Sequence, residues 1–156
     1  MAQPSLNLDD AYEACRKETA QWAKTFYLGT MLLPPAKRRA IWAIYVWCRR
    51  TDELMDSTEA QKKSRNELSD RLNQWEDKTK NIFAGNTQDD LDAVLADTLQ
   101  KFPQSIQPYL DMIEGQRMDL DTTRYKTFEE LELYCYRVAG TVGLMTQGVI
   151  GIDAAY

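Results

Sequence analysis

Apolar and polar residues follow one another along this chain with the period of an α-helix. Apolar positions recur three and four residues apart, whereas no segment alternates every second residue for long enough to predict a strand. We therefore expect an all-α fold. The predicted helices cover approximately residues 9–23, 35–56, 64–84, 89–101, 105–118 and 127–151, with a further apolar segment at residues 25–33 and a polar loop at residues 57–63.

Local signals mark where some of these helices begin and end. Ser64 with Glu67, and Thr127 with Glu130, have the spacing of capping boxes. In such a pair, each side chain satisfies a backbone N–H group that the first turn leaves without a partner. Gly85 follows a predicted helix in the position that often ends a helix with a left-handed residue.

The helix predicted at residues 35–56 is unusual in its distribution of apolar residues. Residues 40–48 are apolar on all sides, which indicates a helix that is buried all round. At about 100° per residue, one sector of this helix holds Ile41, Tyr45, Cys48, Asp52 and Asp56. Two carboxylates one turn apart therefore continue an apolar stripe that we expect to face the core.

A pair of core-facing carboxylates needs a compensating partner, because buried charge is costly and the two groups repel each other. Mg²⁺ is suitable, since it binds one or two carboxylates and completes its octahedron with water and phosphate oxygens. Arg49 shares the face of Asp52 and Asp56, and both Arg49 and Arg50 offer bidentate contacts to phosphate. The pattern predicts a divalent-cation and phosphate site; the alternative is a solvated helix end with ordinary ion pairs.

Two further segments combine residues in an uncommon way. Gly140 and Gly143 lie within a predicted helix, although glycine costs roughly 1 kcal/mol there relative to alanine. They form either a wall that leaves room for a long apolar ligand or a place of close helix–helix packing. Lys24, Thr25 and Phe26 bring together a cation, a hydroxyl group and an aromatic ring, and they either contact a ligand or end a helix over the core.

The amino-acid composition excludes several classes of function and of catalytic site. The net charge of −5 argues against nucleic-acid binding, which requires a basic face. The absence of histidine excludes Ser–His–Asp and Cys–His catalysis and His-ligated zinc. The three cysteines are far apart without a CxxC pair, so we expect reduced core residues. No signal or transit peptide is visible and no apolar run reaches the roughly 18 residues of a spanning helix, so we expect a cytoplasmic protein.

Four segments together resemble the squalene/phytoene synthase family, in its cyanobacterial and plant-type phytoene branch. They are AKTFYLGT (residues 23–30), RRAIWAIYVWCRRTDELMD (38–56), FPQSIQPYLDMIEGQRMDL (102–120) and YCYRVAGTVGLM (134–145). Members of this family have an isoprenoid-synthase-type helical bundle around a central cavity, with two aspartate-rich motifs facing each other across its mouth. The resemblance implies the same fold for this chain.

By this resemblance, five residues form the polar part of a site. Asp52 and Asp56 match the first aspartate-rich motif, which binds Mg²⁺, or Mn²⁺ in its place, and bridges it to the substrate diphosphate. Arg49 matches an arginine that contacts diphosphate. Lys24 and Thr25 match the stretch that lines the diphosphate pocket.

The resemblance places five other residues in the apolar part. Phe26 matches the cavity beside the diphosphate. Tyr134, Val138, Ala139 and Gly143 match positions of the cavity wall near the reacting carbons. By the same resemblance Tyr134 is expected to be catalytic. The absence of a histidine base is compatible with the reaction, because the diphosphate itself or a tyrosine can take the released proton.

The implied reaction is the head-to-head condensation of two geranylgeranyl diphosphates to phytoene, a step of carotenoid biosynthesis that needs Mg²⁺ and no NADPH. One alternative is a squalene-type synthase of the same family, which needs NADPH. Another is a non-catalytic helical partner protein. The apolar product makes peripheral membrane contact an option, although no segment has the pattern of a dedicated amphipathic anchor. The oligomeric state stays open.

The second aspartate-rich motif of the family follows the last matching segment and is not found in this sequence. We therefore expect residues 1–156 to be the N-terminal part of a single squalene/phytoene synthase domain whose C-terminal part is absent. We also expect this part to be inactive alone. Thr146 stands where relatives more often have serine, which is a mild departure.

Overall fold

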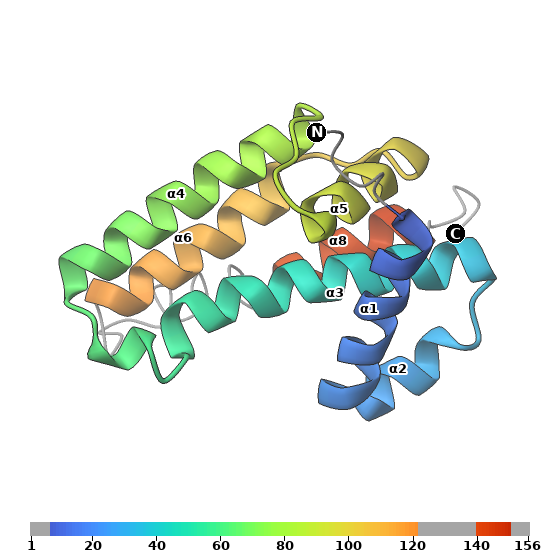
Figure 1. Cartoon of the computed structure of the whole chain (residues 1–156), viewed down its shortest axis with the longest axis horizontal. Helices are drawn as coiled ribbons and strands as arrows, with labels where there is room; N and C mark the ends of the chain where they lie inside the picture. Colours follow the sequence, from blue (N-terminus) through green and yellow to red (C-terminus); the bar gives the residue numbers. More distant parts are fainter. Residues whose placement is uncertain (1–6, 122–139, 151–156) are drawn as a thin grey trace, which may run out of the picture.

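The computed structural model of the chain describes residues 7–121 and 140–150 (Figure 1). Within these two ranges the secondary structure consists of helices, and no strand occurs there. The prediction of an all-α fold is confirmed. The helices are α1 (Leu8–Trp22), α2 (Lys24–Thr30), α3 (Pro35–Asp56), the 3₁₀ helix η1 (Ala60–Lys62), α4 (Arg65–Phe83), α5 (Asp90–Lys101), α6 (Gln107–Asp121) and α8 (Thr141–Ile150).

The predicted helix boundaries hold best where a local signal fixes them. Helix α3 has the predicted bounds, with Pro35 at its first position. The apolar segment at residues 25–33 is helical only to Thr30, and the polar loop at 57–63 contains the short η1. Helix α6 continues to Asp121, beyond the predicted end. The capping box predicted at residues 127–130 lies outside the described residues.

Side-chain caps explain several helix starts. The hydroxyl of Ser64 accepts a hydrogen bond from the backbone N–H of Glu67 at 3.2 Å, which is the first half of the predicted capping box. Asn7 caps α1 by accepting from the N–H of Asp9 at 3.1 Å. Gly85 has a φ of +91°, the left-handed conformation predicted for the end of α4.

Helix α3 is the central element of the fold. It contacts α1, α5, α8, α4, η1 and α6, so it is covered from several directions (Figure 1). Helices α4 and α6 lie side by side along one half of the molecule, while α1 and α2 cover the other end of α3. The prediction that residues 40–48 are buried all round is confirmed except at Tyr45, which is half-buried.

A ladder of tryptophan and threonine side chains joins α3 to α4. Trp47 donates from Nε1 to the hydroxyl of Thr79 at 3.3 Å, and Trp75 donates from Nε1 to the hydroxyl of Thr51 at 2.8 Å. The rings of Trp47 and Tyr109 meet edge to face with centroids 4.8 Å apart. All these polar atoms are buried with a partner, so the ladder specifies how α3 is set against its neighbours.

The described cysteines behave as core residues. Cys15 and Cys48 are buried free thiols, as predicted, and Cys135 lies outside the described residues. Burial raises the pKa of the Cys15 thiol to about 12 and also raises that of Cys48. None of the helices in the described residues has the length and apolar character needed to cross a bilayer.

Candidate functional site

A cleft of about 770 Å³ runs along one face of α3. The predicted stripe of five α3 residues forms a continuous part of its wall, so helix periodicity located this face correctly. Residues from α1, α2, α6 and α8 complete the lining. The lining residues are Trp22, Phe26, Ile41, Ile44, Tyr45, Cys48, Arg49, Asp52, Glu53, Asp56, Ser57, Thr58, Met112 and Thr146.

The lining of the cleft changes from polar to apolar along its length. Its polar end lies at the last two turns of α3, where Asp52 and Asp56 stand, and its apolar end lies near Ile41 and Phe26. A second hollow of about 270 Å³ adjoins the apolar end, because Phe26, Ile41 and Thr146 line both. This arrangement suits an amphiphile with an anionic or metal-bound head and a long apolar tail.

Both carboxylates of the acidic motif are exposed, which corrects the expectation that they face the core. Other helices cover the opposite faces of the last turns of α3, where Thr51 is buried, whereas Asp52 and Asp56 lie on the face that lines the open cleft. The earlier members of the stripe, Ile41 and Cys48, are buried as expected. A charge at the mouth of a cleft loses only part of its hydration, so it is accessible to a ligand.

The surroundings of Asp52 disfavour its ionised form. Its pKa lies above the ordinary value, first because the surrounding protein removes part of its hydration and second because Asp56 repels its charge. Asp119 of α6 acts in the same direction. A hydrogen bond from Gln116 Nε2 to Asp52 Oδ1, at 2.9 Å, and the charge of Arg49 oppose the shift. A bound cation would relieve the remaining repulsion.

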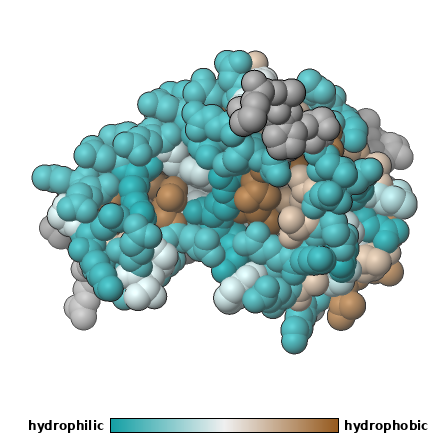
Figure 2. All heavy atoms as spheres, in the orientation of Figure 1, coloured by the Kyte–Doolittle hydropathy of each residue, from teal (hydrophilic) through white to brown (hydrophobic). Residues whose placement is uncertain are grey.

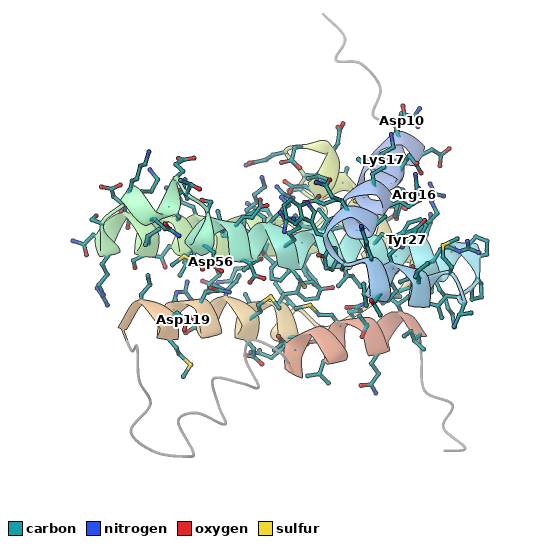
Figure 3. All side chains as sticks on the ribbon, turned by 90° about the horizontal axis from the view of Figure 1, so that it is seen from below. Asp10, Arg16, Lys17, Tyr27, Asp56 and Asp119 are labelled. Carbon is teal, nitrogen blue, oxygen red and sulfur yellow. The ribbon has the colours of Figure 1, made fainter. Side chains whose placement is uncertain are left out.

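The residues at this end fit Mg²⁺ in kind and in number. Asp52 and Asp56 are hard oxygen donors one turn apart, and Mg²⁺ commonly takes one or two protein carboxylates with water and phosphate oxygens. Figure 3 shows Asp56 on α3 and Asp119 on α6 at the same end of the molecule. No group of three or more metal-binding side chains is found among residues 7–121 and 140–150.

Arg49 lines the cleft but is already engaged. Its guanidinium lies 3.7 Å from the ring centroid of Trp22 and pairs with Glu18 at 3.0 Å and with Glu53 at 2.7 Å. An anionic ligand would therefore exchange with these carboxylates. The stacking on Trp22 can hold the guanidinium at the cleft while that exchange takes place.

Arg50 does not belong to the site, contrary to the interpretation that both arginines serve phosphate. One residue along a helix is a rotation of about 100°, and Arg50 leaves the cleft face for α5. There it pairs with Asp89 at 3.2 Å and with Asp92, whose side chain is fully buried, at 3.3 Å. Its role in this structure is to join α3 to α5.

Of the three residues of α2 that the sequence singled out, one lines the cleft and two do not. Phe26 lines both hollows, and its expected place beside a diphosphate stays a prediction. Lys24 and Thr25 are exposed in the first turn of α2 and do not line the cleft. Their expected contact with diphosphate stays a prediction.

Two glycines of α8 differ in the space around them, and only Gly143 is one of the two that the sequence singled out. An added Cβ at Gly143 would meet nothing within 4 Å, so this position leaves open space. At Gly148 a Cβ would lie 2.7 Å from Cγ of Gln104, so close packing occurs there. Gly143 itself does not line the described hollows. Tyr134, Val138 and Ala139 lie outside the described residues, and their expected roles stay predictions.

The sequence did not single out several residues of this site. Gln116, Asp119 and Met112 all come from α6 and approach α3 from a distant part of the chain. Residues 102–120 were noticed only as a segment of the resemblance. Trp22 was overlooked because a lone tryptophan at a helix end carries no local signal of a cation contact.

Known proteins similar to this chain are enzymes of one family. The squalene/phytoene synthase family profile matches residues 19–155. The 15-cis-phytoene synthase of Synechocystis is 61% identical over 152 residues, which are 97% of this chain and 44% of that protein. The corresponding enzyme of Synechococcus elongatus is 58% identical over 98% of this chain and 49% of its own length. A chloroplastic phytoene synthase of Narcissus pseudonarcissus is 56% identical over 93% of this chain and 33% of its own.

Solved structures agree with the fold. A dehydrosqualene synthase in complex with a ligand has a TM-score of 0.78 and 32% identity, over 91% of this chain and 48% of that one. A squalene synthase from Alicyclobacillus acidocaldarius has a TM-score of 0.81 and 27% identity, over 95% and 54% respectively. The chain thus spans about half the length of the relatives it matches, or less.

Proposed function

The chain belongs to the squalene/phytoene synthase family, and we propose that it supplies one side of the active site of a phytoene synthase. The proposed reaction joins two geranylgeranyl diphosphates head to head to give phytoene, for carotenoid biosynthesis. The observation that carries this proposal is the cleft along α3, whose acidic end continues into an apolar end with an adjoining apolar hollow. That polarity matches a substrate with a diphosphate head and a long hydrocarbon tail.

The acidic end would hold the diphosphate head through a cation. Asp52 and Asp56 would bind Mg²⁺, and Gln116 keeps Asp52 in place. Bound there, Mg²⁺ would supply positive charge to the diphosphate oxygens as the leaving group departs. With Asp52 and Asp56 as its carboxylate ligands, this chain would hold one side of the metal site.

Arg49 would contact the diphosphate directly. Its guanidinium can offer two parallel N–H donors to phosphate oxygens. In the structure Glu18 and Glu53 occupy those donors, and both carboxylates are partly exposed to water. Because ion pairs that are partly exposed to water contribute modestly to stability, exchanging them for a diphosphate would cost little free energy.

The apolar end would protect the reacting hydrocarbon. Ile41, Cys48 and Met112 are buried and present no strong hydrogen-bonding group to the cleft. Phe26 adds an aromatic face. Such a lining excludes water from an allylic carbocation, which water would otherwise capture.

The runner-up is a squalene-type synthase of the same family. It is supported by the solved structures, which are those of a dehydrosqualene synthase and a squalene synthase. Sequence favours the phytoene reaction, because the similar phytoene synthases are 54–61% identical and these two structures only 27–32%. The two reactions differ in their need for NADPH.

A hybrid enzyme tests the proposal. Residues 1–156 are joined to the part of the Synechocystis 15-cis-phytoene synthase that follows its matching region, and the product from geranylgeranyl diphosphate is identified by chromatography with and without NADPH. We expect phytoene in the presence of Mg²⁺, with no effect of NADPH. Residues 1–156 alone should give none.

Matched variants of the hybrid give the controls. Asp52→Asn and Asp56→Asn should remove nearly all activity, whereas Lys80→Gln, on the outer face of α4, should keep it. A folded hybrid that makes no phytoene would favour the non-catalytic partner. A reduced product that appears only with NADPH would favour the squalene-type reaction.

A further inference from the structure

Trp22 differs from the other three tryptophans of the chain in burial and in hydrogen bonding. Trp42, Trp47 and Trp75 have exposed fractions of 5%, 1% and 6%, and each donates from Nε1 to a threonine hydroxyl. Trp22, the last residue of α1, is 55% exposed, and in the part of the chain that the structure describes its Nε1 has no hydrogen-bond partner. The three buried tryptophans serve packing, whereas Trp22 needs another explanation.

The exposed ring of Trp22 lies against a cation in the cleft. Hydrophilic residues predominate on the face of the molecule that Figure 2 shows, and on such a surface a cation is a natural partner for an exposed ring. Cζ of Arg49 lies over the ring of Trp22, 3.7 Å from its centroid, and both residues line the cleft. The negative face of the ring attracts the guanidinium at this distance.

The last turn of α1 makes a second contact with the same guanidinium. Glu18 lies one helical turn before Trp22, so the two side chains share a face of α1. Helix α1 packs against α3 (Figure 1), and Oε1 of Glu18 accepts a hydrogen bond from Nε of Arg49 at 3.0 Å. Helix α1 therefore contacts Arg49 with a ring on its flat face and with a carboxylate at its edge.

These two contacts involve different parts of the guanidinium. The ring covers the flat face, which carries no N–H donor. Glu18 pairs with Nε, and Glu53 of α3 pairs with Nη2 at 2.7 Å, so the two carboxylates share the donors of one edge. A phosphate that binds in a bidentate way uses two parallel N–H donors of this kind. It would compete with the carboxylates and leave the stacked ring in place.

We propose that α1 sets the affinity of the cleft for diphosphate through Trp22 and Glu18. Trp22 is a positioning residue, whose ring holds the guanidinium of Arg49 at the cleft before and after the ligand binds. Glu18 is an internal competitor, whose carboxylate occupies Arg49 in the free chain and is displaced by the ligand. This inference rests on the proposed contact between Arg49 and diphosphate and adds to it a built-in limit on how tightly the ligand binds.

The exposure of the pair favours exchange over a purely structural role. The side chains of Arg49 and Glu18 are 21% and 29% exposed, so water can hydrate the carboxylate when it is displaced. The neighbouring pair between Arg50 and Asp92 is the contrasting case, because the side chain of Asp92 has no exposed surface. A carboxylate that is fully buried cannot be released to water without unfolding its surroundings.

Titration of the full 156-residue chain with inorganic pyrophosphate in excess Mg²⁺ tests both roles. Trp22→Leu removes the ring and should weaken binding about two- to five-fold, which corresponds to the loss of an exposed cation–π contact. Trp22→Phe keeps an aromatic face and should restore most of the affinity. Glu18→Gln should act in the opposite direction and strengthen binding about two- to three-fold, because it removes the competing charge.

Glu13→Gln is the matched control for charge. It removes one negative charge from the same helix, about 140° around the axis from Glu18, where Glu13 pairs with Arg16. The affinity for pyrophosphate should stay at the wild-type value. Circular dichroism checks that each variant is folded, which we expect because Glu13, Glu18 and Trp22 all lie at least partly in water.

Fluorescence quenching by acrylamide follows the contact between Trp22 and Arg49 directly. Trp22 is the exposed one of the four tryptophans, so the difference between the wild type and Trp22→Phe isolates its signal. Arg49→Gln should increase the quenching of Trp22, because the ring loses its cover. Saturating Mg²⁺ and pyrophosphate should leave the quenching of the wild type unchanged, because the ring stays on the guanidinium.

The possible failures are distinguishable. If Arg49→Gln weakens binding and Trp22→Leu does not, Trp22 has no positioning role, although the proposed function stands. If Glu18→Gln binds no better than Glu13→Gln, Glu18 does not compete. Quenching that rises on ligand binding to the level of Arg49→Gln would mean that the guanidinium leaves the ring, which overturns the positioning role. A folded wild-type chain that binds no pyrophosphate in Mg²⁺ would count against this inference and the proposed function together.

Discussion

Gln116 of α6 donates a hydrogen bond from Nε2 to Oδ1 of Asp52 on α3 at 2.9 Å, and only 4% of Gln116 is exposed. A buried amide needs a partner, and here the partner is a carboxylate at the mouth of the cleft. The bond joins two residues that are 64 positions apart. It fixes one oxygen of Asp52 and favours the ionised form that binds a cation.

Gln116→Met should therefore weaken binding of a divalent cation. Methionine keeps the shape and removes the donor, so the pKa of Asp52 should rise further and the carboxylate should lose its orientation. Loss of such a supporting partner costs about ten-fold or more in metal affinity. Titration with Mn²⁺, followed by electron paramagnetic resonance, measures the change. Gln107→Met removes an exposed amide–carboxylate bond on the same helix and should leave the affinity unchanged.

Asp52→Asn should leave the metal-free chain at least as stable as the wild type at neutral pH. The folded-state pKa of Asp52 is raised, so its charge opposes folding above that pKa and ceases to do so when acid protonates it. The variant should melt at an equal or higher temperature at pH 7. The difference should disappear as the pH falls through the range in which Asp52 titrates.

Asp92→Asn is the contrasting case. The side chain of Asp92 is fully buried, contacts Arg50 at 3.3 Å and Lys78 at 3.5 Å, and accepts from the N–H of Gln88. Removing its charge leaves two cations with less compensation, which should lower stability by about 2 kcal/mol. A melting temperature as high as that of the wild type would contradict the role given to this contact.

Arg49→Gln and Arg50→Gln should separate ligand binding from stability. The first should weaken binding of inorganic pyrophosphate in the presence of Mg²⁺ and change the free energy of unfolding by about 1 kcal/mol or less, since its ion pairs are partly exposed to water. The second should lower stability and leave pyrophosphate affinity unchanged. Calorimetric titration and thermal melting measure the two effects, and exchanged results would refute the assignment.

Gly143→Ala and Gly148→Ala should have opposite effects on stability. Space is open at Gly143, so alanine should stabilise α8 by up to about 1 kcal/mol. At Gly148 the new methyl group would meet Gln104, which also accepts a hydrogen bond from Tyr109 at 3.0 Å. Thermal melting of both variants decides whether this glycine is there for close packing.

The sequence predicted the parts of this structure that depend on local spacing. The bounds of α3 and the shared face of Ile41, Cys48, Asp52 and Asp56 follow from one proline and the helical period. Exposure of the two aspartates could not be predicted in the same way. It depends on which face of α3 the neighbouring helices leave open as a cleft, and no residue of α3 encodes that.

Long-range contacts explain the other differences. Arg50 was assigned to phosphate because it follows Arg49, but its partners, Asp89 and Asp92, come from α5. Gln116 escaped notice because its partner is distant in the chain. The predictions for Mg²⁺, for Tyr134 and for the extent of the domain stay predictions.

The hydrogen bond between Trp75 and Thr51 has a consequence for how this helix could change over evolution. Thr51 points into the core and its neighbour Asp52 into the cleft, so the bond locks the rotation of α3 about its own axis. Side chains on the cleft face can then be exchanged one at a time without moving the backbone that carries them. Substitutions on the cleft face could therefore change the length or shape of the ligand that fits, while each residue of the wall kept the same position in space.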